Sequence, residues 1–179
     1  ATRSLREVLL GAGEVLGDAR FMLMIVIYSG FWILYFQNFS TILWYLGEFV
    51  DTRSVSAAVS ALLGALGLPA TFKVAAEHVT VINAGTIILL QMVVSRTVKD
   101  RPALPTMVAG MCIGAVGFTL LASSQNGWVF VAGAAVFSIG EMTAHPKYYS
   151  FIGLVAPAER KAVYMGYGFL YGVFGALLG

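Results

Sequence analysis

The chain has 179 residues, of which 59% are hydrophobic and only 11% are charged. An ordinary soluble domain carries about 25% charged residues, so this composition is typical of an integral membrane protein. The net charge of +2 is distributed over short segments between apolar runs rather than along one face, which argues against a nucleic-acid-binding protein. The single cysteine, Cys112, lies within an apolar run and cannot form an intrachain disulfide.

An amphipathic pattern comes before the first long apolar run. Residues 1–20 place apolar side chains at helical spacing among arginines and acidic residues, which predicts an interfacial linker helix. The sequence has no initiator methionine, and it stops at Gly179 inside a hydrophobic run. We therefore expect it to be a piece of a longer protein.

Five apolar runs are each predicted to cross a membrane, because about 20 apolar residues in a helix span a bilayer. A shorter pattern over about 55–67 has helical spacing, but Gly67 and Pro69 end it too early for a crossing, so we expect a short lateral or re-entrant helix. The fold class is thus an all-α membrane protein, with a transmembrane bundle over residues 21–179. The predicted spans cover about residues 21–47, 79–98, 106–122, 128–155 and 162–179.

The positions of the basic residues predict the orientation of the bundle. Eight of the eleven lysines and arginines lie before the first span, between the second and third, or between the fourth and fifth. Since cytoplasmic loops carry an excess of Lys and Arg, the N-terminal end of the chain should be cytoplasmic. We expect a bacterial inner membrane.

The fourth span, residues 128–155, contains three ionisable side chains, Glu141, His145 and Lys147. Such groups are expensive at membrane depth and usually belong to an ion or substrate path. Ser138, Glu141, His145 and Tyr148 recur at helical spacing and should share one face of the helix, whereas Lys147 falls off it. Pro146 removes a backbone hydrogen bond and should kink the helix beside this cluster.

Two other spans offer polar side chains to the same site. The first span supplies Tyr35, Gln37 and Asn38, and the second supplies Asn83. Each assignment has a structural alternative: the asparagines could join helices by hydrogen bonds, as amides do in transmembrane bundles. His145 could be a satisfied structural histidine, and Lys147 could serve only to neutralise Glu141.

Small residues indicate close helix packing. Gly110 and Gly114 form a GxxxG step in the third span, and Gly168 with Gly172 and Gly175 with Gly179 repeat it in the fifth. Such steps let helix backbones approach where lipid provides no hydrophobic drive for association. We expect a packed bundle.

Several stretches together resemble one transporter family. GEMTAHPKYY, followed by Ala156 and Pro157 and by MGYGFLYG from Met165, is similar to helices ten and eleven of the proton-dependent oligopeptide transporters, a branch of the major facilitator superfamily. FWILYFQNFST over 31–41 resembles their helix seven, and INAGTIILL over 82–90 resembles their helix eight.

This resemblance implies that the chain is a C-terminal half, helices seven to eleven of twelve, whose N-terminal half is missing. It implies that Glu141 lies in a central cavity and helps to bind the amino terminus of a peptide, near Tyr35, Gln37, Asn38 and Asn83. His145 and Lys147 depart from the family pattern. The proton-coupling motif of the family lies on its first helix, outside this chain.

We therefore expect a proton-coupled symporter of a small polar solute, a peptide or related amino compound, that works by alternating access in contact with membrane lipid. Glu141 would bind a cationic group or titrate, Lys147 would bind an anionic group, and His145 would tune the proton affinity of Glu141. The alternative is a membrane scaffold or assembly subunit without transport activity. We expect no enzyme, cofactor or metal site, since GEMTAH is not the HExxH zinc motif.

Overall fold

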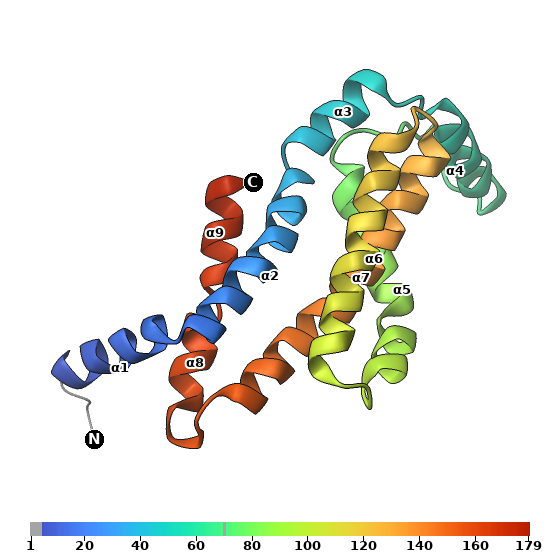
Figure 1. The fold of residues 1–179 in the computed structure, drawn as a ribbon. Coiled ribbons are helices and arrows are strands. Elements are labelled where there is room, and N and C mark those ends of the chain that lie inside the picture. Colours follow the sequence, from blue (N-terminus) through green and yellow to red (C-terminus); the bar gives the residue numbers. More distant parts are fainter. Residues whose placement is uncertain (1–4, 70) are drawn as a thin grey trace.

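The computed structural model describes residues 5–69 and 71–179, with side chains from residue 11 onward. Its regular elements in these ranges are helices, which confirms the predicted all-α fold (Figure 1). Their bounds are α1 Leu5–Gly17, α2 Ala19–Gln37, α3 Thr41–Phe49, α4 Arg53–Ala65, α5 His78–Val98, α6 Ala103–Ser123, α7 Gly127–Val155, a 3-10 turn at Ala158–Arg160, α8 Lys161–Tyr167 and α9 Leu170–Leu178.

Within the described residues, four helical segments are long and apolar enough to cross a membrane: Ala19–Phe49, His78–Val98, Ala103–Ser123 and Gly127–Val155. The fifth predicted span, 162–179, is instead divided into α8 and α9. The helix tightens there, because the Phe169 amide donates to Gly166 and the Gly172 amide to Phe169, each three residues back. Glycines favour this break because they weaken a helix interior.

A similar break divides the first long segment. α2 ends at Gln37, and α3 begins at Thr41 after a tight turn. The Asn38 side-chain amide donates to the carbonyls of Leu34 and Tyr35, at 3.3 and 3.1 Å, and so adds a donor to backbone oxygens of the last turn of α2.

The junction of α1 and α2 is tied to α8. The Asp18 carboxylate caps α2 by accepting from the amides of Arg20 and Phe21, each at 3.1 Å. Its other oxygen accepts a hydrogen bond from the Tyr164 hydroxyl at 3.0 Å, and Arg160 forms an ion pair with Glu14. Residues 1–4 of the predicted interfacial helix lie outside the described residues, and its placement at a membrane surface stays a prediction.

Helices α6 and α7 form the closest pair in the fold, lying side by side in Figure 1. Glycines line the contact: a Cβ on Gly110 would lie 2.6 Å from the Ala144 nitrogen, and one on Gly133 would lie 2.8 Å from the Leu121 nitrogen. A Cβ on Gly117 or Gly140 would likewise collide with backbone of the facing helix. Close backbone approach through small residues therefore builds this pair.

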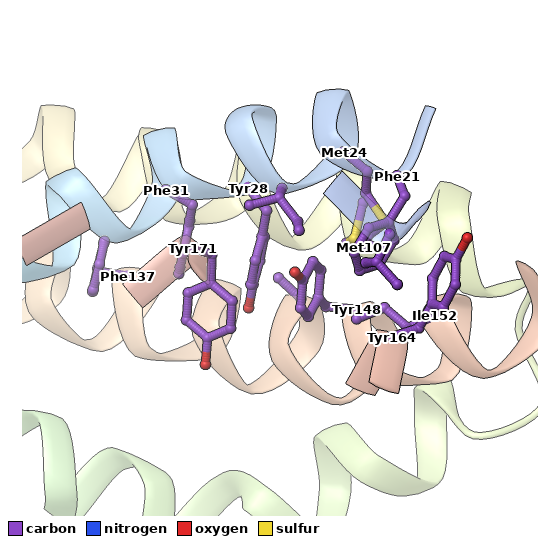
Figure 2. Packing of buried hydrophobic residues seen from close by; sticks show 13 residues of the cluster. Phe21, Met24, Tyr28, Phe31, Met107, Phe137, Tyr148, Ile152, Tyr164 and Tyr171 are labelled. Atoms are coloured by element: carbon purple, nitrogen blue, oxygen red, sulfur yellow. The ribbon is translucent and has the colours of Figure 1, made fainter. Parts of the chain in front are cut away.

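Large aromatic side chains fill the space between α2 and α7 (Figure 2). The rings of Tyr28 and Tyr148 stack at 4.0 Å between centroids, and those of Phe31 and Phe137 stack at 5.4 Å. Tyr171 of α9 packs edge-on against Tyr28 at 4.9 Å. Buried aromatic pairs thus hold α2 and α9, which lie side by side, against α7.

The connection between the first two long segments returns to the start of α7. Asp51 accepts a backbone hydrogen bond from Gly127 at 3.1 Å, and its amide donates to Gln125 at 2.7 Å. The Asp51 carboxylate is paired with Arg53, whose donated hydrogen bonds lower the pKa of that carboxyl to about 2. The short helix α4 occupies the stretch where the sequence predicts a lateral helix.

Candidate functional site

The core of the candidate site is a set of three polar side chains shared by α5 and α7. The Asn83 side-chain amide donates to the Glu141 carboxylate at 3.1 Å and to the Ser138 hydroxyl at 2.9 Å. Ser138 is fully buried and donates in turn to the Ala134 carbonyl at 2.9 Å. The structure therefore brings together three of the predicted site residues, with the half-buried Glu141 as the charged group.

A small cavity adjoins this set on the side facing α2. It has a volume of about 50 Å³, which exceeds the roughly 10–15 Å³ that a single water needs. Asn83 forms part of its wall and also donates to the Glu141 carboxylate, which is not itself part of the wall. The other polar groups on its wall belong to Tyr35, Asn38 and Thr80. Tyr35, Asn38 and Asn83, all predicted site residues, thus border one cavity.

His145 lies one turn further along α7, in a separate aromatic environment. Its Nδ1 and the Tyr28 hydroxyl are hydrogen-bonded at 3.0 Å. Trp32 packs edge-on against the imidazole at 5.5 Å between centroids, and Tyr149 does so at 5.3 Å. The predicted polar face of α7 is thus divided, since Ser138 and Glu141 meet α5 whereas His145 meets α2.

Tyr148, the last residue of the predicted polar face of α7, is bonded to the backbone of the chain rather than to the Glu141 cluster. Its ring is fully buried, and its hydroxyl donates to the Gly168 carbonyl at 2.7 Å. This carbonyl lies at the break between α8 and α9, where the Gly172 amide bonds to Phe169 instead. The side chain therefore satisfies a backbone oxygen that the helix break leaves free.

Lys147 lies apart from the Glu141 cluster. Its side chain is 6% exposed, and its ammonium group donates to the carbonyls of Lys99 and Arg101, at 3.0 and 2.8 Å. These oxygens belong to the turn between α5 and α6, so Lys147 holds the end of α5 in place. Lys147 and Glu141 form no ion pair in the part of the chain that the structure describes, so the contacts do not support the alternative in which Lys147 only neutralises Glu141.

Gln37, another predicted site residue, lies away from the Glu141 cluster and the small cavity. Its side-chain amide donates to the carbonyl of Gly179, at the end of α9. It does not border the small cavity. Of the residues that sequence reasoning left out of the site, Tyr149 and Tyr171 bring their hydroxyls within 3.3 Å of each other beside His145. In the sequence, only their aromatic character could have indicated that these tyrosines lie beside His145. Aromatic residues occur throughout these spans, so this signal does not single them out.

The described residues hold no group of three or more His, Cys, Asp or Glu side chains that could bind a metal ion. What they offer is one carboxylate, an amide and a hydroxyl beside a small cavity, and an imidazole one turn away. Such groups can accept a proton, hold a cationic group or bind water inside a membrane.

Comparison with known proteins finds a partial likeness to one membrane transporter. The chain is 37% identical over 86 residues to an uncharacterized MFS-type transporter, YdeE, of Escherichia coli strain K12. That match covers 46% of this chain and 21% of the relative, so the chain spans only part of the length of the curated protein it matches. No family model matches the chain, and no solved structure matches it significantly.

The four long apolar helices support an integral membrane protein, and the partial likeness is to a transporter of the major facilitator type. This likeness does not show that the chain belongs to the oligopeptide branch of the superfamily.

Proposed function

We propose that the protein is a proton-coupled symporter of a small polar solute, a peptide or related amino compound, that works by alternating access in a bacterial inner membrane. The observation that carries the proposal is the Glu141 carboxylate inside a long apolar helix, hydrogen-bonded to Asn83 at the wall of a small cavity. A carboxylate at membrane depth is costly and is usually kept for function.

The proposed roles follow from the contacts. Glu141 accepts the proton or the cationic group of the solute, and Asn83 holds its carboxylate in place. Tyr35 on α2 and Asn38, which directly follows α2, bind polar groups of the solute from across the cavity. A volume of about 50 Å³ holds water rather than a peptide, so the solute enters in a conformation that separates α2 from α5 and α7.

The second half of the polar face supports coupling in this proposal. His145 lies one turn from Glu141 and is bonded to Tyr28 of α2. A proton gained or lost at His145 would change its bond to α2, and with it the spacing between α2 and α7. The N-terminal half of the transporter, implied by the sequence resemblance, would complete the cavity from the opposite side.

The direct test is Glu141→Gln in the full-length protein, reconstituted in proteoliposomes with labelled alanylalanine as the probe. We expect uptake driven by an inward proton gradient to be lost while exchange between equal pH values continues, because exchange needs no net proton movement. Glu48→Gln is the matched control, since Glu48 is an exposed carboxylate at the end of α3. Driven uptake that survives Glu141→Gln would rule out the proposed role of this residue.

A second arm separates solute class from mechanism. If the wild-type protein shows no uptake of alanylalanine but takes up free amino acids with proton entry, the peptide assignment fails and the symport mechanism stands. Proton entry is followed with a pH-sensitive dye trapped in the liposomes. Absence of solute-dependent proton entry with every probe contradicts the symporter proposal as a whole.

A further inference from the structure

A second hollow in the molecule lies outside the candidate site. It is a groove of about 520 Å³ between α5 and the α6–α7 pair, next to the turn that joins α5 to α6. This volume falls within the roughly 300–1,000 Å³ of small-molecule sites. Its wall is mostly apolar and includes Val94, Val98, Ala109, Ile113 and Ile139.

One end of the groove carries a positive charge. Arg101 forms part of the wall and is exposed, while the hydroxyls of Thr97 and Thr143 donate to carbonyls of their own helices at 2.9 and 2.8 Å. Lys99 and Asp100 beside Arg101 approach each other at 3.7 Å, so their charges largely cancel. The guanidinium of Arg101 therefore dominates the charge at this end.

The turn that presents Arg101 is held from inside the bundle. Lys147 donates to the carbonyls of Lys99 and Arg101, which fixes the backbone on which Arg101 stands. Lys147 follows Thr143, a residue of the groove wall, by one turn of α7. The buried ammonium thus shapes the charged end of the groove without entering it.

From these features we propose that the groove binds an anionic glycerophospholipid, with one acyl chain between α5 and α6 and the phosphate at Arg101. α5 ends at Val98 and α6 begins at Ala103, so Arg101 lies where two apolar helices of crossing length meet and where a headgroup would stand. The groove is open to the outside, since Val93 on its edge is 61% exposed.

The apolar groove with a cation at its end complements a lipid with an anionic headgroup and a hydrocarbon tail. Basic pockets between transmembrane helices bind anionic headgroups in this way. A soluble polar ligand would leave the apolar wall unused, and a neutral lipid would leave Arg101 without a partner. The proposal depends on the membrane location of the chain and not on the transport mechanism.

The test uses the full-length protein, purified and mixed with equal amounts of dioleoyl phosphatidylglycerol and dioleoyl phosphatidylcholine, which carry the same chains. Native mass spectrometry then reports which lipid stays bound. We expect phosphatidylglycerol to be retained preferentially. We expect Arg101→Gln to weaken its binding about fivefold, because a basic residue at a membrane surface contributes on the order of 1 kcal/mol to the attraction of anionic lipid.

Two further variants separate the headgroup from the chain. Ala109→Trp fills the groove and should reduce retention of both lipids at this site, whereas Lys161→Gln removes an exposed cation at another turn and should change nothing. High salt should lower retention of phosphatidylglycerol by the wild-type protein, since exposed charges are screened. This last measurement needs no variant to fold.

The proposal is overturned if the wild-type protein retains both lipids equally, or if high salt leaves the preference unchanged. It is also overturned if a cysteine placed at residue 109, with the exposed Cys112 first replaced by Ser, crosslinks to another segment of the full-length protein rather than reacting with a lipid-soluble maleimide, because the groove would then be filled by protein.

Discussion

The side-chain amide of Asn83 lies between two groups of α7, donating to the Glu141 carboxylate at 3.1 Å and to the Ser138 hydroxyl at 2.9 Å. This one residue joins α5 to α7 and forms part of the wall of the small cavity. Its position explains how the carboxylate is held in one orientation. It also makes Asn83 the natural point at which to disturb the site without removing its charge.

Replacing Asn83 with Ala should reduce gradient-driven uptake about tenfold, because one hydrogen bond to a charged group is worth about 1.5 kcal/mol or more. The measurement is initial uptake rate in proteoliposomes over a range of solute concentration. Gln91→Ala is the control on the same helix, since the Gln91 amide bonds only to the exposed Ser95 among the described residues. Equal losses in both variants would indicate general damage to α5.

Replacing Lys147 with Met should destabilise the protein rather than abolish solute recognition. The change leaves the carbonyls of Lys99 and Arg101 without the charged donor, and such a loss costs about 2 kcal/mol. Thermal unfolding in detergent should therefore shift downward, with the KM for uptake unchanged in the protein that remains folded.

The matched control for this variant is Lys161→Met, which removes an exposed lysine. A different result, unaltered unfolding together with a raised KM, would place Lys147 in the solute path, as the sequence alone suggested.

The α6–α7 contact predicts which glycines tolerate a methyl group. Gly110→Ala should destabilise the bundle by about 1–3 kcal/mol, because its Cβ would lie 2.6 Å from the Ala144 nitrogen and the backbones must separate. Gly85→Ala is the control, since a Cβ there meets no described atom within 4 Å. The measurement is the unfolding temperature of each variant, which should be lower for Gly110→Ala than for Gly85→Ala. Similar values would argue against the tight contact between α6 and α7.

The break between α8 and α9 should depend on the Tyr148 hydroxyl. Tyr148→Phe leaves the Gly168 carbonyl buried without its donor, which costs about 1–3 kcal/mol. Hydrogen exchange should quicken over residues 165–172 in this variant. Tyr45→Phe on α3 is the control and should leave exchange in that segment as it was. Unchanged protection after Tyr148→Phe would mean that packing alone stabilises the break.

The sequence by itself was enough for the fold class, and it indicated Asn83, Ser138 and Glu141, whose side chains meet in the structure and whose role in a functional site stays a prediction. Hydrophobic runs of membrane length predict helices without knowledge of their neighbours, because the backbone satisfies itself within each helix. Helical spacing likewise placed Ser138 and Glu141 on one face of α7. The GxxxG step at Gly110 and Gly114 predicted close packing, and both glycines lie against neighbouring side chains or backbone.

Other features came only from the tertiary structure. Spacing along α7 cannot say which neighbour each position meets, so it placed Ser138, Glu141, His145 and Tyr148 in one group where α5 and α2 divide them. The hydrophobicity of the fifth span gave no sign of a helix break, or of a tyrosine hydroxyl from α7 that donates to the Gly168 carbonyl there.

Lys147 shows the difference most clearly. The sequence identifies a buried cation, since a lysine inside an apolar helix must find a partner. Which partner it finds depends on the distance between α7 and the α5–α6 turn, segments more than 40 residues apart in the chain. Long-range packing brought the ammonium to backbone carbonyls instead of to Glu141, and this made it a support for the fold.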